Sequence, residues 1–352
     1  LFVATCLREP FQEGQSIFNK EGYGTQSVLL LNNGDNTYTD ITAAAGLTYI
    51  HNTFQGVFAD IEGDGDMDLV VAYDTGTVKT WRNNGNLTFT DMPNPTTDEF
   101  AYPMGIAVGD YNNDQRPDFA FSNIGDMGPM TFMVRGDLTS EQVLNEQLIL
   151  LENQGDFTFT DIAEEMQFGD YEFGWGLVMA DFNNDSKEDV VMAQNYIALP
   201  PYQLFRSPSR FLLQGPTGFE SVDHLTGTTN REFAISPLYA DFNRDGALDL
   251  VLVNLDQAPR VFINDGLTVP YLGLTFPSDV ASLNATVTVT TDAGTSTKTV
   301  YPTQGLGADS THALLFALPD ATNIETVSVT YVSGETNTIN EATLNSYYVV
   351  EN

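Results

Sequence analysis

The chain has 352 residues, 42% of them hydrophobic, which is enough for one large folded unit and an appended domain. Its 48 acidic and 13 basic side chains give a formal net charge of −35, which repels the phosphates of nucleic acids and anionic lipids. The single cysteine excludes an internal disulfide, and no apolar run approaches the ~20 residues of a membrane span. We therefore expect an acidic globular protein with no nucleic-acid partner and no direct membrane insertion.

The chain opens with an apolar stretch, L-F-V-A-T, at residues 1–5. This stretch matches the sequence L-V-V-A at residues 69–72, which follows an acidic loop in a repeated unit. Residues 1–5 therefore correspond to the second strand of such a unit. We expect the parent polypeptide to continue upstream with the first strand and the acidic loop of this unit.

One pattern recurs four times along the chain: an apolar strand, a nine-residue acidic loop and a second apolar strand. The first aspartates of the loops lie 50, 71 and 60 residues apart, at Asp60, Asp110, Asp181 and Asp241. This spacing is the length of a four-stranded propeller blade with loop insertions. A second element lies between the copies, in which an N-G or Q-G-D step between two strands predicts a hairpin. Each repeat is therefore expected to form one blade of four strands.

We refer to residues 60–68, 110–118, 181–189 and 241–249 as loops one to four. The four loops are variants of the form D-x-[D/N]-x-D-G-x-x-D, with glutamate at position 3 of loop one and no glycine at position 6 of loops two and three. Oxygens at positions 1, 3, 5 and 9 with a main-chain carbonyl at position 7 suit Ca²⁺. Up to four Ca²⁺ ions are predicted. The candidate ligands are Asp60, Glu62, Asp64, Asp66 and Asp68; Asp110, Asn112, Asp114, Arg116 and Asp118; Asp181, Asn183, Asp185, Lys187 and Asp189; and Asp241, Asn243, Asp245, Ala247 and Asp249.

Position 6 of the loops is predicted to need a left-handed main chain. Gly65 and Gly246 supply it in loops one and four, whereas Gln115 and Ser186 replace glycine at a cost of ~1–2 kcal/mol each. Loops one and four are therefore expected to bind most firmly. A saline habitat or simple solubility would also explain an acidic excess, but four loops at blade spacing favour calcium over solvated turns. Because an oxygen-saturated calcium shell leaves no position for substrate, we expect a structural role.

Two insertions interrupt the regular spacing, at residues 124–147 and 195–209. The first ends in a helix-like stretch over residues 138–147, and the second is rich in proline and tyrosine. Insertions in propellers lie on the rim or the faces, where partners bind. Each insertion is equally compatible with a loop that packs on its own blade.

The loops resemble the FG-GAP/VCBS repeats of integrin α-chain propellers, and the chain is more similar to the cartilage acidic protein group. In that group such repeats precede an ASPIC/UnbV domain. The closer resemblance rests on T-D-I-T-A-A-A-G-L at residues 39–47 and on the strand-like segments that begin at Ala285, Thr297, His312 and Val327. It implies an all-β fold: a β-propeller of about seven blades, of which about five lie in residues 1–268 with the first incomplete, and a small C-terminal β domain at residues 269–352.

The resemblance implies calcium-dependent binding or adhesion outside the cell, with a protein or glycan partner at the cell surface or in a larger assembly. The three histidines, His51, His224 and His312, stand in none of the usual catalytic motifs. We therefore expect a secreted, non-catalytic calcium-binding propeller that acts in binding, adhesion or assembly. Two alternatives stay open: an accessory or non-catalytic part of a polysaccharide- or phospholipid-active secreted enzyme, and a permanent subunit of a surface complex.

Overall fold

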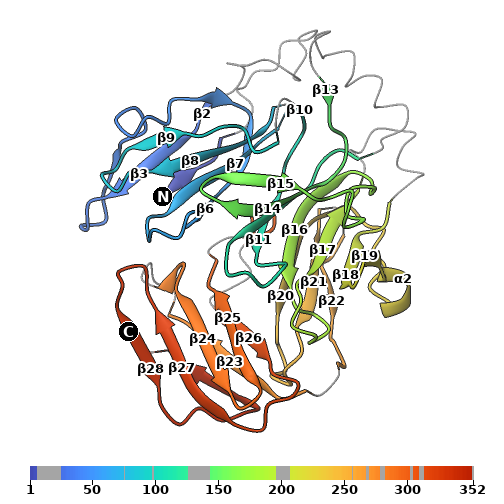
Figure 1. Cartoon of the computed structure of the whole chain (residues 1–352). Coiled ribbons are helices and arrows are strands. Elements are labelled where there is room, and N and C mark those ends of the chain that lie inside the picture. Colours follow the sequence, from blue (N-terminus) through green and yellow to red (C-terminus); the bar gives the residue numbers. More distant parts are fainter. Residues whose placement is uncertain are drawn as a thin grey trace.

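The computed structural model of the chain consists almost entirely of small β-sheets (Figure 1). Most neighbouring strands are antiparallel, so the all-β prediction is confirmed. None of the described helices is long and apolar enough to cross a membrane. The structure describes residues 1–5, 25–74, 76–96, 99–125, 143–195, 207–255, 257–266, 269–277, 282–301, 304–308 and 313–350.

Five consecutive sheets contain the repeats. Their strands are β1 (Phe2–Val3), β3 (Val28–Asn32), β4 (Tyr38–Asp40), β6 (Thr53–Ala59), β7 (Asp68–Tyr73), β8 (Val78–Asn83), β9 (Phe89–Asp91), β11 (Ile106–Gly109), β12 (Asp118–Phe121), β14 (Ile149–Gly155), β15 (Thr158–Asp161), β16 (Gly174–Ala180), β17 (Asp189–Gln194), β18 (Arg210–Gly215), β19 (Gly218–Ser221), β20 (Ala234–Ala240), β21 (Asp249–Asn254) and β22 (Arg260–Phe262). The sheet orders are β1-β3-β4, β6-β7-β8-β9, β11-β12-β14-β15, β16-β17-β18-β19 and β20-β21-β22. Each acidic loop joins the first two strands of its sheet, as the repeat pattern predicts.

The five sheets pack against one another, which explains why their second strands are largely apolar after the first residue. Every residue of β7, β12 and β17 is buried, and hydrophobic clusters join each sheet to the next. The innermost strands β6, β11, β16 and β20 neighbour one another in chain order. The sheets therefore stand in a row like blades, from blue to gold in Figure 1. A closed ring stays a prediction.

Short elements lie outside these sheets. Strand β2 (Thr25–Gln26) pairs with β5 (Ile50–His51), β10 (Glu99–Phe100) pairs with β13 (Val143–Leu144), and α2 (Asp223–Thr226) follows β19. The prediction of a helix-like stretch over residues 138–147 is wrong at Val143 and Leu144, because parallel pairing of β13 with β10 holds these two residues extended. Most of both insertions lies outside the described residues.

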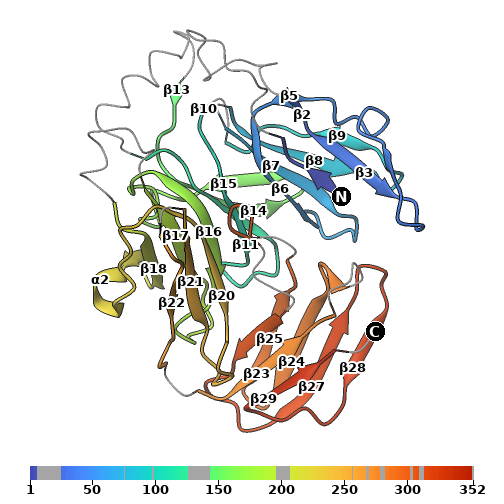
Figure 2. The ribbon, with the colours of Figure 1, turned by 180° about the vertical axis from the view of Figure 1, so that it is seen from behind.

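The C-terminal unit has two sheets, β26-β23-β29 and β25-β24-β27-β28, shown in orange to red in Figures 1 and 2. Its strands are β23 (Tyr271–Thr275), β24 (Thr286–Thr291), β25 (Gly294–Thr299), β26 (Ala313–Ala317), β27 (Ile324–Thr330), β28 (Thr336–Ile339) and β29 (Ser346–Val349). The alternation of valine and threonine in β24 buries Val287 and Val289 in the core between the sheets. The predicted boundary after residue 268 stays a prediction.

A short segment of the C-terminal unit reaches the innermost strands of the blade sheets. The Gly305 N–H donates a hydrogen bond to Leu177 O of β16 at 2.8 Å, and Leu306 N–H donates to Ser236 Oγ of β20 at 3.1 Å. Gly176 makes this approach possible, because a Cβ there would lie 2.7 Å from the Leu306 nitrogen. The two parts of the chain are therefore joined by main-chain contacts.

The Gln304 side chain extends the same junction. Its Oε1 accepts a hydrogen bond from Met179 N–H at 2.8 Å, and its Nε2 donates to Val108 O at 3.1 Å. We expect Gln304→Ala to lower the free energy of unfolding by about 2–3 kcal/mol, because two buried main-chain groups lose their partner. Urea denaturation checks this, with Thr295→Ala at an exposed position of β25 as the control. An equal, negligible effect of both substitutions would contradict the prediction.

Candidate metal centres

All four acidic loops share a left-handed main chain at the same two positions. The residue at position 6, predicted to be left-handed, has a φ of 90° at Gly65, 68° at Gln115, 66° at Ser186 and 88° at Gly246. That prediction is confirmed, including in the two loops without glycine. Position 4 is also left-handed, which the sequence interpretation missed although glycine or asparagine there in three loops is a visible signal. These residues are Gly63, Asn113, Asn184 and Arg244.

The aspartate at position 1 holds each loop together by accepting main-chain hydrogen bonds. In loop three, Asp181 Oδ1 accepts from Asp185 N–H at 3.0 Å, and Asp181 Oδ2 accepts from Ser186 N–H at 2.9 Å. The same two bonds form in loops one, two and four. In loop three each of these oxygens keeps a further lone pair, whereas in loop one Asp60 Oδ1 also accepts a hydrogen bond from Gly63 N–H at 2.8 Å. The position 1 carboxylate therefore points into its own loop with lone pairs left for a cation.

The carboxylate at position 5 fixes the second half of the loop. In loop three, Asp185 Oδ1 accepts a hydrogen bond from Lys187 N–H at 3.0 Å, and the other loops repeat this bond. At position 3, Asn183 Oδ1 accepts from Asp185 N–H at 3.0 Å. The predicted ligand positions 1, 3, 5 and 7 are thus tied to one another through the main chain.

The aspartate at position 9 is the most buried of the candidate ligands. Asp189 has no exposed surface, and its two oxygens accept hydrogen bonds from Phe182 N–H at 3.0 Å and Gln214 N–H at 2.9 Å. The other three loops form the same pair of bonds. Burial raises the pKa of Asp189 to about 8 and that of Asp68 to about 7. Position 9 therefore anchors the loop to the third strand of its own sheet.

In the sheets that contain loops two, three and four, an amide side chain at the end of the third strand links neighbouring loops. It donates a hydrogen bond to the main-chain carbonyl at position 2 of the loop in the preceding sheet. The donors and acceptors are Asn153 and Ile61, Gln214 and Tyr111, and Asn264 and Phe182, at 2.9, 3.1 and 2.9 Å. Sequence reasoning missed this link, although the Asn or Gln shortly before the glycine turn was visible in each repeat.

Loops two, three and four are also connected directly. The side chain at position 4 donates to the carbonyl at position 6 of the next loop: Asn113 Nδ2 to Ser186 O at 3.1 Å, and Asn184 Nδ2 to Gly246 O at 3.0 Å. The three loops therefore form a continuous row along one end of the sheets. A change in one loop acts on its neighbour through these bonds.

The structure does not bring every predicted ligand to one point. Within the described part of the chain, no three histidine, cysteine, aspartate or glutamate side chains converge closely enough to hold a metal. In loop one, Glu62 accepts a hydrogen bond from Arg82 Nε at 2.7 Å. In loop two, Asp114 forms an ion pair with Arg116, a residue predicted to contribute its carbonyl alone. A cation would have to displace these arginine contacts.

The donor chemistry of the loops nevertheless fits calcium. Every candidate ligand atom is a carboxylate, amide or main-chain oxygen, which is the set that this hard cation prefers. Loops two, three and four each have an asparagine at position 3, so the predicted ligands of these loops are not all acidic. Burial raises the pKa of Asp110 and Asp181, and the positive charge of Lys298 partly opposes the shift at Asp181.

Two tyrosines of the C-terminal unit contact loop four. The Tyr347 hydroxyl donates a hydrogen bond to Asp241 Oδ2, and the Tyr271 hydroxyl donates to Arg244 O at 3.1 Å. Burial and the bond to Asp241 raise the pKa of Tyr347, so its hydroxyl stays protonated and acts as a donor. Loop four is therefore shared between the blade sheets and the C-terminal unit.

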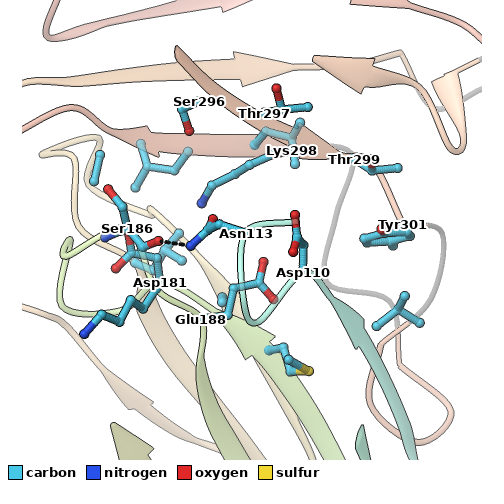
Figure 3. A pocket seen from close by; sticks show the side chains of 18 of the residues that line it. Asp110, Asn113, Asp181, Ser186, Glu188, Ser296, Thr297, Lys298, Thr299 and Tyr301 are labelled. Carbon is cyan, nitrogen blue, oxygen red and sulfur yellow. Dashed lines mark hydrogen bonds between the residues drawn. The ribbon is translucent and has the colours of Figure 1, made fainter. Parts of the chain in front are cut away.

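A cavity of about 160 Å³ lies where loops two and three face β25 (Figure 3). Asp110, Asp181 and Glu188 line it from the loops, and the Lys298 side chain extends from β25 toward them. The Glu188 Oε2 atom is buried without a hydrogen-bond partner. Burial raises the pKa of Glu188 to about 7, and the positive charge of Lys298 opposes this shift. Lys298 thus offsets part of the negative charge of the two loops.

His51 and His224 lie in separate elements of the described structure, β5 and α2. His51 is buried, its Nδ1 accepts a hydrogen bond from Asn52 N–H at 2.9 Å, and its ring stacks on Tyr49. His224 lies in α2, and His312 lies outside the described residues. The environment of His51 is that of a packed core side chain.

Comparison with protein families assigns the two parts of the chain. Residues 60–121 match the FG-GAP-like repeat family, and residues 277–352 match the ASPIC and UnbV family. The chain therefore contains an FG-GAP-like repeat and an ASPIC/UnbV domain, which confirms the resemblance seen in the sequence. The first match spans loops one and two, and the second covers strands β24 to β29.

Among individual proteins, the chain is distantly similar to cartilage acidic protein 1. It is 27% identical to the Xenopus tropicalis protein over 188 residues, which cover 51% of this chain and 26% of that protein. It is 26% identical to the human protein over 194 residues, which cover 52% of this chain and 26% of that protein. The aligned region thus spans about a quarter of the length of these relatives.

Proposed function

We propose that this chain is a non-catalytic calcium-binding module that works outside the cell in binding, adhesion or assembly. Its four loops hold Ca²⁺ through the oxygens at positions 1, 3, 5, 7 and 9, and the bound ions keep the blade sheets in register. The partner is a protein or a glycan, because a formal net charge of −35 opposes association with nucleic acid or anionic membranes.

One observation carries the calcium proposal: four loops, separated by 50 to 71 residues of chain, form the same internal hydrogen bonds. Acidic turns that serve solubility alone have no reason to share a left-handed main chain at positions 4 and 6. Similarity to FG-GAP-like repeats supports the same assignment. An extracellular location suits such sites, because modules there bind calcium with Kd values of about 10⁻⁴–10⁻³ M.

Calcium stoichiometry tests this proposal. We expect flow dialysis with ⁴⁵Ca²⁺ to find up to four ions per chain. Removing the position 5 carboxylate from loops three and four together, with Asp185→Asn and Asp245→Asn, is expected to lower the number by two. A variant with Asp35→Asn and Asp320→Asn, at exposed aspartates outside the loops, serves as the charge-matched control. Absence of saturable calcium binding at millimolar concentrations would refute the proposal.

A further inference from the structure

Loop four differs from the other loops in how its first aspartate is held. In all four loops the position 1 Oδ2 accepts a hydrogen bond from the position 6 N–H. Asp241 Oδ2 accepts a second bond, from the Tyr347 hydroxyl of β29. Among the described residues, no other position 1 aspartate is bonded to the C-terminal unit.

The fold holds Tyr347 in place for this contact. Its ring lies over Gly273 of the neighbouring strand β23, where a Cβ would come within 2.1 Å of the ring. The Arg244 guanidinium also lies over the ring, 5.5 Å from its centroid. Tyr271 packs beside it, with ring centroids 5.8 Å apart, and also lies against Gly246, where a Cβ would be 2.2 Å from the Tyr271 ring. Positions 1, 4 and 6 of loop four are therefore all in contact with two adjacent strands of the C-terminal unit.

We propose that Tyr347 is a positioning residue of the loop-four calcium site, and that calcium there and the docked C-terminal unit stabilise each other. The hydroxyl occupies Asp241 Oδ2, so the carboxylate keeps one orientation and leaves Oδ1 for the cation. This inference depends on the proposed calcium binding. Groups that orient a metal ligand in this way usually change metal affinity by about 10–100-fold when removed. Because coupling between two binding events is reciprocal, the cation strengthens the docking by the same factor.

Hydrogen–deuterium exchange of the full chain, measured across a calcium titration, tests this coupling. We expect calcium to slow exchange in loop four and in β29 of the wild-type chain with one common midpoint. In the Tyr347→Phe variant, the midpoint for loop four is expected to shift to an about tenfold higher calcium concentration. Calcium is expected to have no effect on exchange in β29 of this variant. Loop one has no described contact with the C-terminal unit and should keep its wild-type midpoint, which also shows that the variant is folded.

Tyr348→Phe is the matched control. It removes a hydroxyl from the next residue of β29, and that hydroxyl accepts its hydrogen bond from Thr343 within the C-terminal unit. We expect wild-type midpoints in this variant. If Tyr347→Phe also keeps the wild-type midpoints in loop four and β29, the coupling is refuted while calcium binding stands. If calcium slows exchange in none of the loops of any variant, calcium binding itself is refuted.

Discussion

Replacing calcium by EGTA is expected to lower the unfolding temperature of the intact chain by about 10 °C. A ligand that binds the folded state at 100 times its Kd contributes about 2.7 kcal/mol per site, and 1 kcal/mol corresponds to about 2–4 °C in large domains. Two firmly occupied loops are enough for the expected shift. Without a cation, the buried carboxylates at positions 1 and 9 stay desolvated and close to one another, which destabilises the folded state. Differential scanning calorimetry measures the shift directly.

The formal net charge of −35 makes a second comparison necessary, because any added salt screens repulsion in so acidic a chain. Samples in EGTA should therefore receive NaCl to the ionic strength of the calcium sample, and a third series should receive Mg²⁺. Magnesium is expected to restore little of the lost stability, since it requires a small octahedral shell and releases its water reluctantly. Equal rescue by Mg²⁺ or by NaCl would mean that the loops are acidic turns that respond to screening alone.

The elements that the sequence predicted well are those defined by short stretches of chain. Each acidic loop lies between two strands in the structure because the apolar runs on both sides are long enough to be buried between sheets. The left-handed position 6 was predictable from Gly65 and Gly246, and Gln115 and Ser186 follow because the surrounding hydrogen bonds are the same. The ASPIC/UnbV domain was recognisable for a similar reason, since the strand segments that carry the resemblance are short stretches of chain in a fixed order.

Contacts between distant parts of the chain were not predictable. Tyr347 meets Asp241 across 106 residues, and Gln304 meets Val108 across 196, so nothing in the local pattern indicates either pair. The same limit applies within loop one. The spacing placed Glu62 among the ligands, but its carboxylate forms a salt bridge with Arg82, which comes from β8. A long charged side chain forms its ion pair with the opposite charge that the tertiary fold brings near it, and the local sequence does not show which charge that is.

Position 9 shows a different limit of sequence reasoning. A buried aspartate at the start of a strand can serve as a metal ligand or as an acceptor for main-chain N–H groups. Both roles require aspartate at position 9, so the sequence motif does not distinguish them. The structure gives Asp189 the second role in full, because both of its oxygens accept main-chain hydrogen bonds. The first role stays a prediction, and the two roles differ in whether the residue matters without metal.

Asp189→Ala is accordingly expected to destabilise the chain by about 3–5 kcal/mol in EGTA as well as in calcium, because it leaves two buried N–H groups unpaired and creates a cavity. Asp185→Ala, four residues earlier in the same loop, is the matched comparison. The Asp185 side chain is exposed and accepts one main-chain hydrogen bond, from Lys187. It should cost less than about 1 kcal/mol in EGTA and about 2–3 kcal/mol more in calcium, where the cation site is lost.

Urea denaturation of both variants in each buffer separates the two contributions. The difference between Asp189→Ala and Asp185→Ala in EGTA measures the anchor at position 9, because no cation is bound to either variant. The additional loss of each variant in calcium measures the cation site in loop three. If Asp189→Ala were as mild as Asp185→Ala in EGTA, the hydrogen bonds to Phe182 and Gln214 would contribute little to folding. Position 9 would then be a metal ligand whose burial the bound cation alone makes tolerable.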